Sequence, residues 1–282
     1  MSGILIVDAG STKTTWSLLN NNKKEPIRLR SIGINSAHYS FETIIGILQD
    51  VRRNLPDFPI DDIYYFGAGC STVKIKDKVK QALWEVFKIN NIWVDSDLRA
   101  AAIATFGYDN GIIGIMGTGS NSGLFLNGKI KTIIPSLGYV LGDEGSGVAL
   151  GKILLNSVFK QQLPKFIIEI FFQEFQITTE EIIHKVYRSE SPASYIASFS
   201  PFLLKHINNP EISTLVINEF DNFFLKNIIP MGDISLYKLG LVGSIAWNFK
   251  EQVKASAQKY GININSIIKE PMPLLEKYYS GK

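Results

Sequence analysis

Two short turns rich in glycine, serine and threonine carry the clearest chemistry in the sequence. The first is DAGSTKT, Asp8 to Thr14, and the second is MGTGSNSG, Met116 to Gly123. Each follows an aliphatic run, and each lets backbone N–H groups approach an anion closely while hydroxyl groups add further donors. Either turn alone also fits an ordinary hairpin bend. Two turns of the same design favour anion binding, and Asp8 at the start of the first could hold magnesium through water.

Neither turn matches the two common nucleotide-binding loops. A Walker A loop needs GxxxxGK[ST] leading into a helix, whereas a strand is expected after DAGSTKT, and the dinucleotide pattern GxGxxG is absent. A third glycine turn, GLVGS at Gly240 to Ser244, could receive a nucleotide's base or ribose. The sequence therefore predicts phosphate binding outside the P-loop and dinucleotide folds.

Three carboxylates lie where they could act in catalysis or ligand binding. Asp97 follows a buried strand and precedes an alanine-rich helix, Leu98 to Phe106, which places it at the carboxyl edge of a sheet. It could serve as a general base or only cap that helix, and Asp95 could be confused with it. Asp143 and Glu144 are adjacent acids between glycines in LGDEGSG. Because one acid would suffice as a helix cap, the pair suggests ligand contact.

The elements that would position these residues follow one repeated strand–turn–strand layout. Strands are expected at Ile4 to Val7 and Thr14 to Leu19, and again at Ile112 to Ile115 and Gly123 to Leu126. We interpret the repetition as an internal duplication with a boundary near Asp109. It divides the chain into an N-terminal domain of residues 1–108 and a C-terminal domain of residues 109–282, the latter with helical additions.

Composition excludes several classes of protein. The 282 residues are 45% hydrophobic and 20% charged, which is typical of a globular chain of about two domains. One cysteine cannot form an internal disulfide, a zinc cluster or an iron–sulfur site. A net charge of +3 without a basic stripe disfavours nucleic acid. No segment reaches the ~20 apolar residues of a membrane helix and no secretory signal is evident, so a cytoplasmic protein with no membrane partner is expected.

Four motifs, taken in order, resemble a known superfamily. DAGSTKT, GTGSNS, LGDEGSGVALG and GLVGS are similar to the phosphate and nucleoside motifs of the sugar-kinase, heat-shock-chaperone and actin superfamily. LGDEGSG is the most specific, and it resembles the N-acetylglucosamine kinases and the related BadF/BadG/BcrA/BcrD ATPase family. The resemblance implies an α/β fold of two RNase H-like (actin-like ATPase) domains, each with a mixed five-stranded sheet, and an interdomain nucleotide cleft.

The resemblance also implies roles for individual residues. Asp97 would be the catalytic base, and Asp8 would hold Mg²⁺ through water. Contacts to ATP are implied for Asp8, Gly10, Ser11, Thr12, Lys13, Thr14, Gly117, Thr118, Gly119, Ser120, Gly243 and Ser244. Contacts to the sugar are implied for Asn35, Ser36, Gly69, Asp97, Asp143 and Glu144. Asn35 is equally well explained as a turn asparagine. The sequence departs from the family at PMPLLEKYY, residues 271–279, where a Gly-Ala-rich final helix is expected.

Three hypotheses follow. The first is an ATP-dependent sugar kinase that phosphorylates the 6-hydroxyl of N-acetylglucosamine or a related amino sugar, with ATP and Mg²⁺ as cofactors. The second is a nucleotide-binding ATPase that switches a protein partner, which needs no base for a sugar hydroxyl. The third is a sugar sensor that has lost catalysis. The family resemblance also implies a homodimer.

Overall fold

The chain divides into two compact units. The computed structural model describes residues 3–20, 25–189 and 191–281. The first unit comprises residues 1–109, 127–129 and 270–282, and the second comprises residues 110–126 and 130–269. The first boundary lies next to the one expected at residues 108 and 109. Residues 270–282 differ from the expectation, because they pack with the first unit although the sequence analysis assigns them to the second domain.

The first unit is built on a mixed sheet with the strand order β3-β2-β1-β4-β5. β1 is antiparallel to β2, which is antiparallel to β3, whereas β1, β4 and β5 are parallel to one another. The unit contains β1 (Gly3–Ala9), β2 (Lys13–Asn20), β3 (Ile27–Ile32), α1 (Phe41–Asn54), β4 (Ile60–Gly67), α2 (Val73–Phe87), β5 (Asn91–Ser96), α3 (Asp97–Phe106) and α13 (Met272–Ser280).

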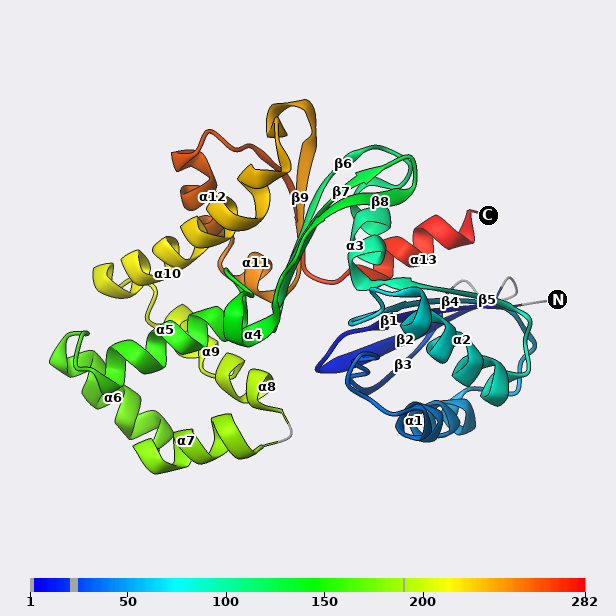
Figure 1. The fold of residues 1–282 in the computed structure, drawn as a ribbon, viewed down its shortest axis with the longest axis horizontal. Helices are drawn as coiled ribbons and strands as arrows, with labels where there is room; N and C mark the ends of the chain where they lie inside the picture. The colour runs from blue at the N-terminus through cyan, green and yellow to red at the C-terminus, as the bar shows by residue number, and fades with distance from the viewer. Residues whose placement is uncertain (1–2, 21–24, 190, 282) are drawn as a thin grey trace. The chain divides into compact units, whose positions relative to one another are not determined.

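Helices cover both faces of this sheet (Figure 1). Leu5, Ile6 and Val7 of β1 are fully buried, as expected of an aliphatic strand with a helix layer on each side. Leu5 and Val7 belong to a core that also contains buried residues of α1 and α2. On the opposite face, β1 and β4 contact α3 and α13. The sheet is therefore fixed from both sides, which holds its strand ends in place.

The final helix, α13, docks on the first sheet through one buried carboxylate. Glu276 is 7% exposed, and its Oε1 accepts hydrogen bonds from Ser17 Oγ at 2.6 Å and Arg28 Nε at 2.7 Å. Arg28 Nη2 donates to the second carboxylate oxygen. The ring of Tyr279 packs on that of Tyr64, with centroids 4.1 Å apart. The segment PMPLLEKYY thus becomes a structural helix of the first unit.

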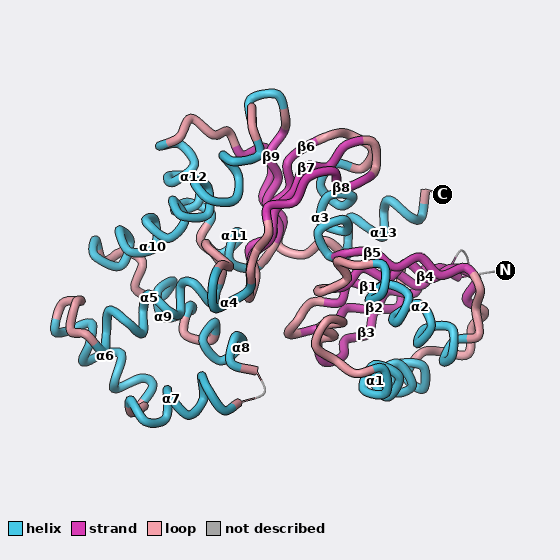
Figure 2. The backbone as a smooth tube through the Cα atoms, in the orientation of Figure 1, coloured by secondary structure: helices cyan, strands magenta, loops and turns pink. Residues whose placement is uncertain are grey.

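The second unit repeats the strand order of the first. Its sheet runs β8-β7-β6-β9-β10, with β6 antiparallel to β7 and parallel to β9. Figure 2 shows β6, β7 and β9 in magenta beside one another. The strands are β6 (Gly111–Met116), β7 (Ser120–Leu126), β8 (Lys129–Ile134), β9 (Lys238–Val242) and β10 (Ile264–Ile268). The two expected strand–turn–strand openings are β1–β2 and β6–β7. The α/β fold of two mixed five-stranded sheets is therefore confirmed.

Helices form most of the rest of the second unit. They are α4 (Gly138–Leu141), α5 (Gly147–Phe159), α6 (Lys165–Phe175), α7 (Thr179–Arg188), α8 (Pro192–Ala197), α9 (Ser200–Lys205), α10 (Pro210–Phe223), α11 (Ser244–Asn248) and α12 (Lys250–Lys259). A π-helical turn (Phe224–Ile228) and two 3₁₀ turns (Ile229–Met231 and Ile234–Leu236) follow α10. Within the described ranges, no helix is long and apolar enough to cross a membrane.

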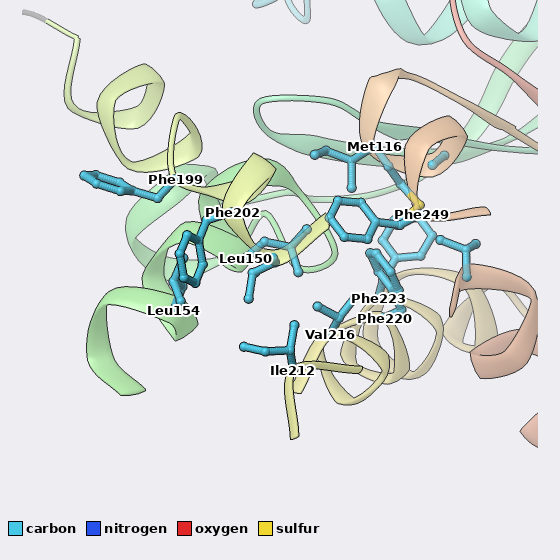
Figure 3. Packing of buried hydrophobic residues seen from close by; sticks show 14 of the residues in the cluster. Met116, Leu150, Leu154, Phe199, Phe202, Ile212, Val216, Phe220, Phe223 and Phe249 are labelled. Carbon is cyan, nitrogen blue, oxygen red and sulfur yellow. The ribbon is translucent and has the colours of Figure 1, made fainter. Parts of the chain in front are cut away.

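Aromatic side chains dominate the core of the second unit. Phe202, Phe220, Phe223 and Phe249 are each at most 1% exposed, and Figure 3 shows them with Met116 and Leu150 of the same cluster. The rings of Phe220 and Phe249 have centroids 5.9 Å apart, which joins α10 to the segment between α11 and α12. Helix α10 is thus anchored firmly in the core.

Replacing Glu276 tests how strongly α13 is held. Glu276→Ala removes a buried partner of Arg28 and Ser17. We expect a loss of about 1–3 kcal/mol of unfolding free energy, because a hydrogen-bonded charge on the sheet face loses its partner. Urea unfolding measures the change. Lys277→Ala, one residue away and exposed, is the control and should change stability little; equal stability of the two variants would contradict this docking role.

Candidate active site

The register of three parallel strands brings Asp8 and Asp97 to the same edge of the first sheet. Asp8 of β1 pairs with Phe66 of β4, and Phe66 pairs with Asp95 of β5. Asp97 follows β5 directly as the first residue of α3. Both carboxylates therefore lie at the carboxyl ends of parallel strands, where α/β proteins commonly bind ligands.

Both carboxylates have raised pKa values, and the charge of Asp97 contributes to that of Asp8. Burial, and after it the negative charge of Asp97, raise the pKa of Asp8 to about 7, while the charge of Lys13 acts against both. Burial also raises the pKa of Asp97, although the Leu98 N–H donates to its Oδ1 at 2.8 Å and opposes the rise. A partly buried carboxylate with a raised pKa is suited to accept a proton near neutral pH.

Asp95 has a different environment from Asp97. Burial acts to raise its pKa, but hydrogen bonds from Lys76 at 2.6 Å and from Arg99 outweigh burial and lower it. The helix cap is also separate from Asp97, because the Ser96 hydroxyl accepts the Arg99 N–H. Helix α3 consequently begins one residue earlier than expected, and Asp97 is not its N-cap.

The DAGSTKT turn is tied to the chain that follows β3. Gly10 N donates to Lys13 O at 3.0 Å and closes the turn. Ile34 N donates to Gly10 O, and Gly33 N donates to Thr12 O, so the segment after β3 runs against the turn. Lys13 Nζ forms an ion pair with Glu270 at 2.5 Å. The turn is thus held by neighbouring backbone on one side and by the start of the α13 segment on the other.

Asn35 joins this turn to the turn after β4. Its Nδ2 lies 3.4 Å from Ser11 Oγ, and its Oδ1 accepts the Ala37 N–H at 3.2 Å, which is a turn-asparagine contact. A Cβ on Gly69 would lie 2.6 Å from Asn35 Oδ1, so the turn after β4 is in direct contact with Asn35. Ser36 is fully buried, with its Oγ 3.4 Å from Tyr65 Oη. Ser36, the next residue after Asn35, is therefore anchored in the core.

In the second unit, the Gly117–Ser120 turn is bound to the LGDEGSG loop. Ser120 N donates to Asp143 Oδ1 at 3.1 Å. Gly147 N and Val148 N, at the start of α5, donate to Gly117 O and Thr118 O. The Ser146 hydroxyl caps α5, so neither acid of the loop is its N-cap. Burial raises the pKa of Asp143, and the Ser120 bond works against that rise.

The GLVGS turn meets the same place in the second unit. Gly243 has φ 128° and precedes α11. A Cβ at this position would lie 2.3 Å from Met116 O and 3.2 Å from Gly117 N, so only glycine allows this approach. The three glycine motifs that the sequence analysis assigns to the second half therefore meet around the end of β6.

Glu144 is held by side chains that sequence reasoning missed. Lys226 Nζ and Asn227 Nδ2 each lie 3.2 Å from one of its carboxylate oxygens. Burial acts to raise the pKa of Glu144, but a backbone hydrogen bond of Glu144 and these two contacts together lower it. Buried Glu219 of α10 accepts the Gly145 N–H at 2.9 Å. No local motif marks these partners, because they come from a helix and a π-turn that lie more than 70 residues downstream.

The residues around Asp8 fit a magnesium ion that arrives with a nucleotide. Asp8 and Asp97 provide hard oxygen ligands, which magnesium prefers, and the charge of Asp97 contributes to the raised pKa of Asp8. Among residues 3–20, 25–189 and 191–281, no group of three or more His, Cys, Asp or Glu could hold a metal ion by itself. Magnesium usually keeps several waters and binds through one or two carboxylates and phosphates. Asp8 would hold it in this way.

Comparison with known proteins identifies the family. No family model matches the chain, and no curated protein matches it. A solved structure from Porphyromonas gingivalis, titled a "Putative N-acetylglucosamine Kinase", has 34% sequence identity and a TM-score of 0.92, with 99% of each chain covered. The chain belongs to the N-acetylglucosamine kinase family of sugar kinases.

More distant structures share the fold of this kinase family. A structure from Chromobacterium violaceum, also described as a "Putative N-acetylglucosamine Kinase", has 14% identity and a TM-score of 0.75, with 99% of each chain covered. A ROK family glucokinase from Streptomyces griseus, solved with glucose and AMPPNP, has 13% identity and a TM-score of 0.56 and covers 99% of this chain and 98% of its own. These similarities agree with the actin-like ATPase fold.

The raised pKa of Asp8 predicts a pH dependence of stability in the ligand-free kinase. The pKa of Asp8 is about 7 in the folded protein and 3.8 in the unfolded chain. The contribution of Asp8 to the free energy of unfolding is therefore fully present below pH 3.8 and is lost as the pH rises from 3.8 through about 7. Between these pH values the stability of the wild type should fall relative to that of Asp8→Asn. Above pH 7 the variant should have the higher free energy of unfolding, by about 1–3 kcal/mol.

Urea unfolding at pH 5.5 and pH 8.5 without nucleotide measures this difference. Asp61→Asn removes an exposed carboxylate of β4 and is the matched control. It should show no growing advantage over the wild type between the two pH values. If the stability of Asp8→Asn changes between the two pH values as much as that of the control does, ionisation of Asp8 does not destabilise the folded protein.

Proposed function

We propose that this kinase transfers the γ-phosphoryl group of ATP to the 6-hydroxyl of N-acetylglucosamine or a related amino sugar. The coarser statement, a sugar kinase, rests on the family. The Asp8–Asp97 pair at the carboxyl edge of the first sheet supports transfer to a hydroxyl group, and the description of the similar structure from Porphyromonas gingivalis supports the choice of sugar. The proposed nucleotide is supported by the AMPPNP in the similar glucokinase structure.

Asp97 is the proposed catalytic base. It would accept the proton of the sugar hydroxyl while the hydroxyl oxygen forms a bond to the γ-phosphorus and the bond from that phosphorus to the β–γ bridging oxygen breaks, which releases ADP. Its burial and the Leu98 N–H hold the carboxylate in one position. Magnesium, when bound through Asp8, would neutralise charge on the phosphates.

The remaining site residues divide into two proposed groups. Backbone amides and hydroxyls of Gly10–Thr14 and Gly117–Ser120 would bind phosphates, and Gly243 with Ser244 would lie near the nucleoside. Asn35, Gly69 and Asp143 would contact the sugar, with Ser36 and Glu144 close by. Supporting this division, Asn35 and Asp143 each contact a proposed phosphate turn of their own unit. The homodimer and the cytoplasmic location stay predictions.

Substitution of Asp97 tests the proposal. ADP release is measured with purified protein, ATP and magnesium against a panel of hexoses and amino sugars. N-acetylglucosamine or a related amino sugar should stimulate release, and Asp97→Asn should lower the stimulated rate by ~10²-fold or more, because the proton acceptor is lost. Asp95→Asn should keep the rate within about tenfold while lowering stability, because Asp95 holds Lys76 and Arg99.

The other outcomes separate the competing functions. ADP release that no sugar stimulates would favour a nucleotide-driven switch, and sugar binding without ADP release would favour a sensor. A sugar-stimulated rate that survives Asp97→Asn but not Asp95→Asn would keep the kinase and move the base to Asp95.

A further inference from the structure

The loop that carries Asp143 adopts a backbone that needs outside support. Asp143 has φ 58° and Gly145 has φ 71°, so left-handed residues lie on both sides of Glu144. A residue other than glycine is strained in this region and keeps the conformation only when surrounding contacts fix it. The loop's own bonds are few: Ser146 N donates to Asp143 O at 3.2 Å, and Asp143 N donates to Ser136 O at 3.1 Å.

Helix α10 supplies a buried acceptor to the middle of this loop. Glu219 is 7% exposed, and its Oε1 accepts the Gly145 N–H at 2.9 Å. Its Oε2 accepts a hydrogen bond from Asn222 Nδ2, one turn further along, at 3.1 Å. Burial raises the pKa of Glu219, and the two bonds act against that rise. The carboxyl group is therefore fixed on both oxygens and directs one of them at the loop.

The π-turn after α10 holds the neighbouring residue of the loop. Lys226 and Asn227 both contact the Glu144 carboxylate, and the Asn227 carbonyl accepts the Ser122 Oγ–H at 2.9 Å. Such π-turns occur frequently at functional sites. A Cβ on Gly145 would lie 2.7 Å from Phe223 Cβ, so the loop rests directly on the end of α10. Phe223 itself is in the core shown in Figure 3.

We propose that Glu219 is a positioning residue for the sugar-binding loop. By fixing the amide of Gly145, it sets the peptide that follows Glu144 and thereby the direction of the Asp143 carboxylate. Glu219 does not touch substrate in this proposal; it acts through Asp143, and the inference rests on the proposed sugar-binding role of Asp143. It assigns a function to α10, a helix from the part of the chain that carries no recognised motif.

Steady-state kinetics measure the positioning effect on the sugar. Glu219→Ala removes the acceptor and should raise the sugar KM roughly tenfold or more, because a displacement of about 1 Å in a binding group can cost up to 10²-fold. The KM for ATP should change less than threefold. Glu219→Gln keeps an acceptor oxygen and should restore the sugar KM. Glu211→Ala, an exposed glutamate of the same helix, is the matched control.

Amide hydrogen exchange of Gly145 tests the contact without any substrate. The exchange rate should rise about tenfold in Glu219→Ala and stay near wild type in Glu219→Gln and Glu211→Ala. If Glu219→Ala does not fold, Glu219→Asp withdraws the acceptor by one methylene and serves in its place. Unchanged Gly145 exchange would overturn the contact. Faster exchange with an unchanged sugar KM in an active kinase would overturn the positioning role, whereas a wild type that no sugar stimulates would overturn the proposed function instead.

Discussion

The parallel alignment of β1, β4 and β5 is the constraint on which the first unit's chemistry depends. It sets Asp8 and Asp97 at one edge of the sheet, where their charges oppose each other in a buried setting. The layers of helices on both faces prevent the strands from shifting to relieve that repulsion. The fold thus maintains an electrostatically unfavourable pair that a cation can make favourable. A raised pKa at a rigid strand end is what a proton acceptor needs.

The second unit reaches an ordered site by a different physical route. Its three glycine motifs meet at the end of β6, where backbone groups lie too close for a Cβ and where the Ser120–Asp143 bond joins the expected phosphate turn to the expected sugar loop. The start of α5 also holds the phosphate turn, so this bond fixes the Asp143 side chain relative to a turn that is already anchored. Preorganisation here comes from close backbone packing and shared hydrogen bonds, whereas in the first unit it comes from strand register.

The sequence allows prediction of much of the fold because the relevant signals are local. Aliphatic runs followed by small-residue turns mark β1 and β6, and the alanine-rich run after Asp97 marks α3. Such local signals do not predict which segments distant in the sequence pack together. The apolar residues of α13 do not indicate which of the two sheets the helix covers. On α10, buried Glu219 cannot be distinguished by sequence from exposed Glu211. Only the fold shows that one of them lies against Gly145, 74 residues away.

The packing of α13 also bears on how the chain acquires its structure. Glu276 completes a hydrogen-bonded cluster with Ser17 and Arg28, about 250 residues earlier in the chain. During synthesis, β1 to α3 emerge long before their last helix, and all of the second unit is made in between. The face of β1 and β2 that α13 covers must wait uncovered through that interval. Contacts at such sequence separation form slowly, so the first unit to leave the ribosome is the last to be finished.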